Sequence, residues 1–432
     1  MSKSAFPTCL LLRNGRILDP SRAFDQTADL LIENGRISRI EPRIGPPDHA
    51  ELIDVTGKLV VPGLIDMHVH LRDPGYPEKE TVLSGCEAAA EGGFTSVACL
   101  PNTQPVLDCP DILHELRHKA ESASARVYPI ACATLGMRGK ELSDTDGLLN
   151  AGAVGFSDDG LPIESASLMR MLLGKSEERG FPVCPHSEVF ELTRGGHMHE
   201  GVVSRELGIA GMPSEGEAVM VERDIRLVRE VGGHLHILHI SVRRAIDLVR
   251  KARAEGLRVS CEAMPHHLAL TDEDVRVLGT QGKMSPPLRS MDDRDAVLEG
   301  LADGTIEVLA TDHAPHTNEE KLRAFPEAPN GILGLETAVG TFFTYLVAEG
   351  ILSAPQVIEK LTTNPARLLG LEAGTLQPGS LADVTVIDPD AFWQVNANDF
   401  RSKSRNTPFH GWTLQGRAVL TLLGGRITHN LL

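Results

Sequence analysis

The chain has 432 residues, and at about 150 residues per domain this length allows one large domain with a smaller one. Hydrophobic residues make up 41% and charged residues 23%, so a sizeable core can form and a wholly disordered or collagen-like chain is excluded. The formal net charge of −17 repels nucleic acids and anionic membranes, so we predict neither as a partner. An anionic ligand would have to be held by local cations.

The cysteines indicate a reducing compartment. All seven are scattered along the chain and none forms a C-x-x-C pair, a pattern that favours free thiols over disulfides or a Cys-ligated zinc site. The opening MSKSAFPTCLLLRNG contains an apolar run too short for a secretory core, and the stretch 337–354 is too polar for a membrane span. Together these features predict a cytoplasmic protein.

Both ends of the chain carry strand and turn signals. Apolar runs flank Asn14-Gly15 and Asn34-Gly35, and Asn-Gly between such runs is the strongest local signal for a hairpin. Near the other end, 382–387 is predicted as a strand and Gly424-Gly425 as the turn of a third hairpin. Because chain termini often lie close together, the two ends are predicted to form one sheet.

The middle of the chain alternates short apolar runs with helical patterns. The runs lie at 63–67, 95–99, 127–131, 154–156, 183–184, 235–238, 257–261 and 306–310, and helical patterns such as 218–231, 242–255 and 294–302 separate several of them. Such alternation produces a parallel sheet, and eight strands close into a barrel. We therefore predict an α/β fold: a (β/α)8 TIM barrel over residues 61–365, with a small composite β-sheet domain built from residues 1–60 plus 366–432.

The first run ends in a candidate metal-binding motif. In a barrel of this kind, catalytic groups lie at the carboxyl ends of the strands. Strand alternation places Asp66, His68 and His70 on one face and Met67 and Val69 on the other. Two imidazoles on one face can bind one metal ion, although most His-x-His pairs are only polar or half-buried groups.

Further candidate ligands follow other strands. Bulky apolar side chains of a barrel strand face the helices, which favours Asp159 over Asp158 as an inward group and turns His186 inward. In the segment 233–239 alternation does not decide which histidines face the interior. His239 is preferred there because it lies nearest the carboxyl end.

The last run ends in Asp312-His313 and completes a set of imidazoles and carboxylates. These ligands suit a divalent metal such as zinc, which lowers the pKa of bound water to about 7 and so provides a hydroxide nucleophile at neutral pH. A carboxylate beside that hydroxide can take its proton and pass it to a leaving nitrogen, the role predicted for Asp312. The pattern predicts a hydrolysis or its reverse.

Nine motifs occur in order along the chain: GLIDMHVHLRDPG at 63–75, LPNTQPV at 100–106, GFSDDG at 155–160, PHSE at 185–188, HISVR at 239–243, MPHHL at 264–268, KMSPPLR at 283–289, LATDHAPHTNEEK at 309–321 and GILGLET at 331–337. They resemble motifs of the amidohydrolase superfamily and, more closely, of bacterial type I dihydroorotases. The resemblance implies reversible cyclisation of N-carbamoyl-L-aspartate to L-dihydroorotate in de novo pyrimidine biosynthesis.

The resemblance also implies which residues form the site. The implied metal centre holds one or two zinc ions, with Asp159 able to bridge two, and consists of His68, His70, Asp159, His186, His239 and Asp312. The implied substrate contacts are Arg72, Asn102, Ser285, His316, Asn330 and Gly331, the last two through their backbone. A guanidinium such as that of Arg72 can clamp a carboxylate through two hydrogen bonds. Without the resemblance, Arg72 could equally be a surface ion pair, Asn102 a turn former and His316 a solvated loop residue.

The chain departs from the family pattern at two points. Related enzymes often have Asn where this chain has Ser285, so that substrate contact would be shorter-reaching or bridged by water. Several amidohydrolases bridge their metals with a carboxylated lysine on the fourth strand, but the segment 126–134 contains no lysine, which leaves Asp159 as the expected bridge.

Two other functions stay open on the sequence alone. A hydantoinase or allantoinase would share the barrel and the metal but accept a different ring. A non-catalytic scaffold for aspartate transcarbamoylase would belong to another class, although such relatives lack metal ligands that are all present here. The metal's number and identity, a homodimer, a complex with aspartate transcarbamoylase and a lid at 316–330 are also open.

Overall fold

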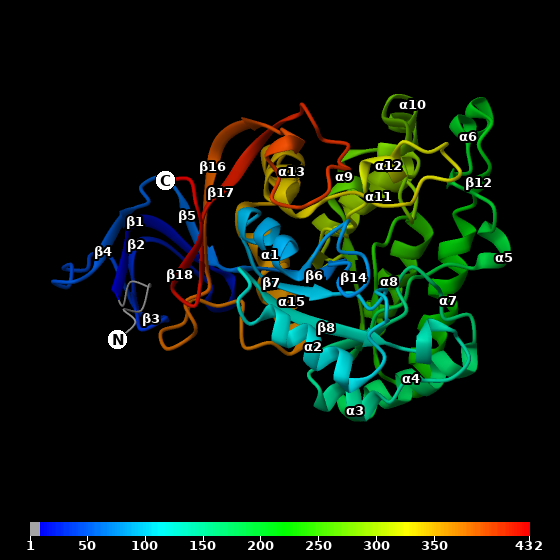
Figure 1. Cartoon of the computed structure of the whole chain (residues 1–432), viewed down its shortest axis with the longest axis horizontal. Helices are drawn as coiled ribbons and strands as arrows, with labels where there is room; N and C mark the ends of the chain where they lie inside the picture. The colour runs from blue at the N-terminus through cyan, green and yellow to red at the C-terminus, as the bar shows by residue number, and fades with distance from the viewer. Residues whose placement is uncertain (1–8) are drawn as a thin grey trace.

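The computed structural model describes residues 9–432, which form a closed parallel barrel beside a mixed β-sheet (Figure 1). Residues 1–8 lie outside the described residues. These eight residues include the start of the predicted β domain. They also include part of the opening segment that we expected to lack a secretory core.

The barrel contains eight parallel strands in chain order, and each overlaps one of the predicted apolar runs. They are β6 (Leu64–Val69), β7 (Phe94–Cys99), β8 (Arg126–Cys132), β9 (Gly155–Ser157), β10 (Pro182–Val183), β13 (His234–Ile237), β14 (Val259–Ala263) and β15 (Val308–Leu309). A parallel bridge between Val69 and His313 closes the ring, and the backbone N–H of His70 donates to the His313 carbonyl at 2.9 Å. The predicted TIM barrel is confirmed.

Amphipathic helices cover the outside of the barrel. They include α1 (Val82–Glu91), α2 (Pro110–Ala120), α3 (Thr145–Asn150), α4 (Ala166–Arg179), α7 (Glu215–Val231), α8 (Arg243–Ala254), α11 (Met291–Ala302) and α14 (Ala354–Leu361). In α8 the buried residues Ala245, Ile246, Val249 and Ala252 follow helical spacing, so one stripe packs on the strands. The three predicted helical segments all lie in helices of this layer.

The composite sheet joins the two ends of the chain. Its strands are β1 (Cys9–Asp19), β2 (Phe24–Glu33), β3 (Arg36–Glu41), β4 (Glu51–Asp54), β5 (Leu59–Pro62), β16 (Val384–Gln394), β17 (Thr413–Leu423) and β18 (Arg426–Asn430). Antiparallel pairing of β5 with β16 connects the early strands, blue in Figure 1, to the late ones, orange to red. The predicted sheet from both ends is confirmed, and β5 leads directly into β6 of the barrel.

Two of the three predicted hairpins are correct and one is wrong. Asn34-Gly35 joins β2 to β3 and Gly424-Gly425 joins β17 to β18, with all four residues at positive φ. Asn14-Gly15 instead lies inside β1, which stays paired with β2 across a bulge between Leu12 and Gly15. Asn14 has φ +61°, so the Asn-Gly signal reports a need for positive φ that a bulge meets as well as a turn does.

Short elements fill the loops around the barrel. They are α5 (Phe190–Thr193), β11 (Met198–His199), α6 (Val202–Leu207), β12 (Gly211–Met212), α9 (Pro265–Ala269), α10 (Val275–Leu278), α12 (Asn318–Lys321), α13 (Ala338–Phe342) and α15 (Thr363–Leu369). In Figure 1, α5, α6 and β12 project on the side away from the composite sheet. Within residues 9–432, no helix combines the length and the apolar character needed to cross a membrane.

Replacing Gly15 by alanine should destabilise the composite sheet. An added Cβ would lie 2.6 Å from Val60 Cγ2 and 2.9 Å from Val55 Cγ2, and branched valine side chains have little freedom to move aside. We expect Gly15→Ala to lower the free energy of unfolding by about 1–3 kcal/mol in chemical denaturation. Gly45→Ala is the control, because a Cβ at Gly45 meets nothing within 4 Å. Equal stability of the two variants would contradict this packing.

Candidate metal centre and active site

The residues predicted as metal ligands converge at the carboxyl end of the barrel. His68 lies in β6, and the other five follow the ends of β6, β9, β10, β13 and β15: His70, Asp159, His186, His239 and Asp312. All six are buried. Side chains separated by up to 244 positions in the sequence therefore meet at one rim.

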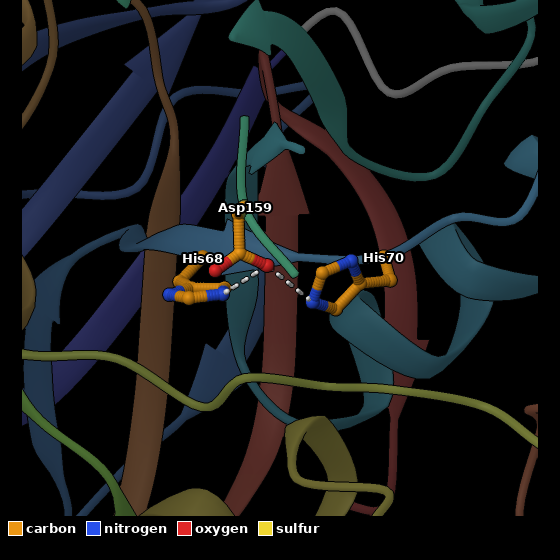
Figure 2. Close-up of side chains that lie close together, drawn as sticks. All are labelled: His68, His70 and Asp159. Carbon is orange, nitrogen blue, oxygen red and sulfur yellow. Dashed lines mark ion pairs between the residues drawn. The ribbon is translucent and has the colours of Figure 1, made fainter. Parts of the chain in front are cut away.

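Asp159 is the centre of this cluster. Figure 2 shows its carboxylate between the rings of His68 and His70, with Oδ2 3.6 Å from His68 Nε2 and 3.5 Å from His70 Nε2. Its other oxygen, Oδ1, lies 3.3 Å from His239 Nε2 and 3.5 Å from His186 Nδ1. Asp159 thus belongs to two ligand groups, one with His68 and His70 and one with His186 and His239, and in each the ligand atoms lie within 4.8 Å of one another.

Asp312 completes the first of these groups. Its Oδ1 lies 3.0 Å from His70 Nε2 and 3.4 Å from His68 Nε2. Burial raises the pKa of a carboxyl group, but the imidazoles around Asp312 lower its pKa below the ordinary value. Asp159, facing four imidazoles, likewise has a pKa well below the usual range despite its burial. Both groups are therefore carboxylates at neutral pH.

Three imidazoles are held by the ring nitrogen that faces away from Asp159. His68 Nδ1 lies 2.6 Å from Glu262 Oε1, His70 Nδ1 2.8 Å from Asn102 Oδ1, and His186 Nε2 2.9 Å from Glu188 Oε2. An acceptor on one nitrogen holds a proton there, so the opposite nitrogen is the one that can bind a cation once it has lost its own proton. The inward nitrogens are thus prepared to bind a cation.

The donor set fits a divalent metal ion. His68 Nε2 is fully buried and has no hydrogen-bond partner among the described residues, although it points at two carboxylates. A buried nitrogen left without a partner is costly unless something else binds it, and imidazole and carboxylate donors suit zinc and several other divalent ions.

Glu262 and Glu188 are functional candidates that the sequence analysis missed. Glu262 lies in β14, is fully buried, and contacts both His68 and His236. Burial alone would raise the pKa of Glu262, but these imidazoles lower it. Glu262 directly follows the apolar run 257–261. An acidic residue in that position was the available signal, since carboxylates are rarely buried without a partner. Glu188 carried no such signal, because it follows the strand in a loop.

Local backbone geometry decides two orientations that alternation did not. Leu235 and Ile237 pack in the layer between strands and helices, and strict alternation would send His239 there with them. His239 has φ +34°, which breaks the alternation and turns its side chain into the centre. In β6, a register shift between Asp66 and Val69 places Met67 in the interior apolar cluster with Ala98. The expectation that Met67 and Val69 share a face is therefore wrong.

The predicted substrate residues line one cavity with the cluster. The cavity has a volume of about 620 Å³, and its lining includes five of the candidate ligands together with Arg72, Asn102, Ser285, His316, Asn330 and Gly331. His68 lies beneath its floor, with no exposed surface.

The surroundings of Arg72, Asn102 and His316 bear on the alternatives considered for them from the sequence. Arg72 donates from Nε to the Pro315 carbonyl at 3.2 Å and forms no ion pair within residues 9–432, so its guanidinium can receive an anion. Asn102 orients His70 as well as lining the cavity. His316 is only 6% exposed and is not a solvated loop residue; its burial and the neighbouring Arg72 lower its pKa, which keeps the ring neutral.

Comparison with known proteins agrees with this architecture. Residues 57–245 match a family model described as Dihydro-orotase-like, and residues 245–429 match one described as Amidohydrolase family. The dihydroorotase of Pelotomaculum thermopropionicum is 49% identical over 97% of this chain and 98% of its own length. That of Geobacter metallireducens is 46% identical over 97% and 99%. The structure of L-hydantoinase (dihydropyrimidinase) from Arthrobacter aurescens has a TM-score of 0.87 at 27% identity, covering 98% of this chain and 96% of that one.

A parallel eight-stranded barrel with a His and Asp cluster at its carboxyl rim defines an amidohydrolase, an enzyme that hydrolyses cyclic amides. Within that class, the relatives at 46–49% identity over nearly the full length decide the group. The chain belongs to the dihydroorotase family.

Replacing Glu262 by glutamine should weaken metal binding. The amide would remove the negative charge that orients His68, and loss of such a partner weakens metal affinity by about 10- to 100-fold. Competition with a chromophoric chelator measures the change. Glu307→Gln serves as the control, because Glu307 precedes β15 and lies at the opposite end of the barrel. Unchanged affinity in Glu262→Gln would refute its positioning of His68.

Proposed function

We propose that this chain is a zinc-dependent dihydroorotase of type I, which interconverts N-carbamoyl-L-aspartate and L-dihydroorotate. One observation carries the proposal: a single cavity places an unpaired guanidinium, Arg72, beside a floor of imidazoles and carboxylates. Both substrates are anions with an amide or carboxyl carbon to be attacked, so they need a cationic clamp and a hydrolytic centre together.

The substrate carboxylate binds to Arg72 in this proposal. Its Nε donates to the Pro315 carbonyl at 3.2 Å, which fixes the guanidinium against the cavity wall. Its Nη2 lies 3.3 Å from His316 Nε2, which itself donates to the Asn330 carbonyl at 2.8 Å, so Nη2 stays free to donate to an anion in the cavity. Asn102 and Ser285 add polar contacts on the same surface, and the short Ser285 side chain leaves room for a water molecule.

The six clustered residues, His68, His70, Asp159, His186, His239 and Asp312, would hold one or two zinc ions. The sharing of Asp159 by two ligand groups supports two ions with Asp159 between them. A divalent cation bound here supplies polarisation of the scissile carbonyl and lowers the pKa of water.

Asp312 moves the proton. In hydrolysis, its carboxylate takes a proton from the water that adds to the ring carbonyl carbon. The bond between that carbon and the ring nitrogen then breaks, and Asp312 returns the proton to the departing nitrogen. In cyclisation the nitrogen attacks the carboxyl carbon, Asp312 accepts the proton of that nitrogen and passes it to the departing oxygen, and a second proton from solvent completes the water that leaves, because the attacked carboxylate is ionised. His70, 3.0 Å away, keeps the Asp312 carboxylate facing the cavity.

The choice of cyclic substrate distinguishes a dihydroorotase from a hydantoinase. Purified metal-loaded protein should turn over dihydroorotate and leave hydantoin nearly untouched, because hydantoin lacks the carboxylate for Arg72. Arg72→Met should raise KM for dihydroorotate about ten- to hundred-fold without loss of metal, since a charge-assisted pair is removed. Arg170→Met, an exposed arginine on α4, is the matched control. Preference for hydantoin would contradict the assignment as a dihydroorotase, and an unchanged KM in Arg72→Met would contradict the role of Arg72.

Asp312→Asn should retain metal yet lose turnover. The amide keeps an oxygen toward the cluster but cannot carry the proton, so kcat should fall about 10²- to 10⁴-fold. Metal content by mass spectrometry and kcat in both directions are measured together. Near-normal turnover would exclude Asp312 as the acid and base, whereas loss of both metal and activity would assign it to binding alone.

We also propose a cytoplasmic setting for this enzyme. All seven cysteines are free, which fits a cytoplasmic enzyme. A homodimer and a complex with aspartate transcarbamoylase remain predictions. A non-catalytic scaffold is disfavoured, because the ligand residues are present and directed to a common point.

A further inference from the structure

One wall of the cavity is held by a side chain from the far end of the sequence. Asn406 is fully buried and lies in the connection between β16 and β17. Its Oδ1 accepts from the His316 backbone N–H at 3.0 Å, and its Nδ2 donates to the carbonyls of Ala314 at 3.0 Å and Gly331 at 3.1 Å. The Asn406 carbonyl also accepts from the Leu333 N–H at 2.8 Å. Asn406 thus ties together the two wall segments 314–316 and 331–333.

A buried lysine donates to the same Gly331 carbonyl from another direction. Lys321, at the end of α12, is 2% exposed and donates from Nζ to the carbonyls of Pro329 and Gly331, both at 3.1 Å. The Gly331 carbonyl therefore accepts from both Lys321 and Asn406. Burying an ammonium group is costly, and burial lowers the pKa of Lys321 to about 7. Backbone carbonyls offset part of this cost, since Nζ also lies 3.4 Å from the Lys283 carbonyl.

The backbone of Gly331 is closely packed against its neighbours in the wall. Its φ is +118°, and a Cβ would lie 2.6 Å from the Ala314 Cβ, so the two wall segments touch there. The Gly331 N–H donates to the Lys283 carbonyl at 3.0 Å, which satisfies the other side of this residue. Both polar groups of Gly331 thus have partners within the wall, so the predicted substrate contact through its backbone would have to compete with them.

We propose that Asn406 and Lys321 are positioning residues that clamp the Gly331 peptide and so preorganise the wall that holds His316 and Arg72. The clamp makes the segment 316–331 a fixed wall and not a lid. Displacement of Gly331 would shift Asn330, whose carbonyl accepts from His316 Nε2. Loss of the Asn406 contacts to Ala314 and His316 would shift Pro315 between them, whose carbonyl accepts from Arg72 Nε. Neither clamp residue lines the cavity, so neither touches substrate. The inference rests on the proposed function for its kinetic consequence only.

The first experiment measures the wall without any assay of activity. Asn406→Asp keeps the shape of the side chain but replaces two donors with oxygen, and Lys321→Met keeps most of the stem but removes the ammonium. Lys360→Met is the matched control: Lys360 is also buried and also donates to a backbone carbonyl, that of Ile306, before β15 and away from the cavity. Hydrogen–deuterium exchange of the amides in 314–333 should become at least about ten-fold faster in the two clamp variants and stay unchanged in the control.

The second experiment measures dihydroorotate kinetics on metal-loaded protein. Both clamp variants should raise KM by about ten-fold or more, with kcat changed less than KM and metal content unchanged, because the substrate wall is disordered and the metal cluster is not. Lys360→Met should leave KM as in the wild type. If the wild type itself has no dihydroorotase activity, the proposed function fails while the exchange result still decides the clamp.

Three outcomes would overturn the clamp. Exchange in 314–333 could be as slow in Asn406→Asp and Lys321→Met as in the wild type. The control could accelerate it equally, which would show general loosening. KM could also stay unchanged while exchange rises, which would show that the wall does not position the substrate contacts. Because the two variants alter different elements, a folding failure in one leaves the other to decide.

Discussion

The mutual neutralisation of buried carboxylates and imidazoles is the constraint on which the rest of the structure depends. An ionised group moved from water into the interior costs several kcal/mol unless charges and hydrogen bonds around it offset that cost. Here Asp159, Asp312 and Glu262 are each enclosed by imidazoles at 2.6–3.6 Å. Such an arrangement requires strand ends from all around the barrel to meet, so the cluster depends on closure of the ring.

The composite sheet takes part in the site as well as in the fold. The predicted domain boundaries assign residues 61–365 to the barrel, and they would place Asn406 in the β domain, away from the active site. In the structure the chain between β16 and β17 returns to the barrel, where the N–H groups of Arg401 and Ser402 approach the Glu336 carboxylate and Asn406 reaches the cavity wall. The late strands therefore anchor a segment on which the substrate wall is built.

The shared scaffold does not by itself decide which ring is opened. The hydantoinase structure from Arthrobacter aurescens has the same fold at a TM-score of 0.87, although only 27% of the residues are identical. Barrel closure brings the imidazoles and carboxylates of the cluster together, and in barrels of this kind the loops after the strands vary with the substrate. In this chain those loops place Arg72 and His316 in the cavity lining, where Arg72 donates to the Pro315 carbonyl and His316 to the Asn330 carbonyl.

The sequence alone determined the barrel, the sheet from both ends and the identity of the candidate ligands, because these depend on local apolar runs and on residues with unusual chemistry at strand ends. It did not decide that Asn14-Gly15 forms a bulge or that Glu262 and Asn406 lie against the site, and strand alternation alone did not turn His239 inward. The bulge follows from the pairing of β1 with β2, and the inward turn of His239 from a positive φ after β13. The contacts of Glu262 and Asn406 follow from buried polar groups that need partners on distant segments. Local patterns carry no information about such partners, and only the closed barrel brings them within hydrogen-bonding distance.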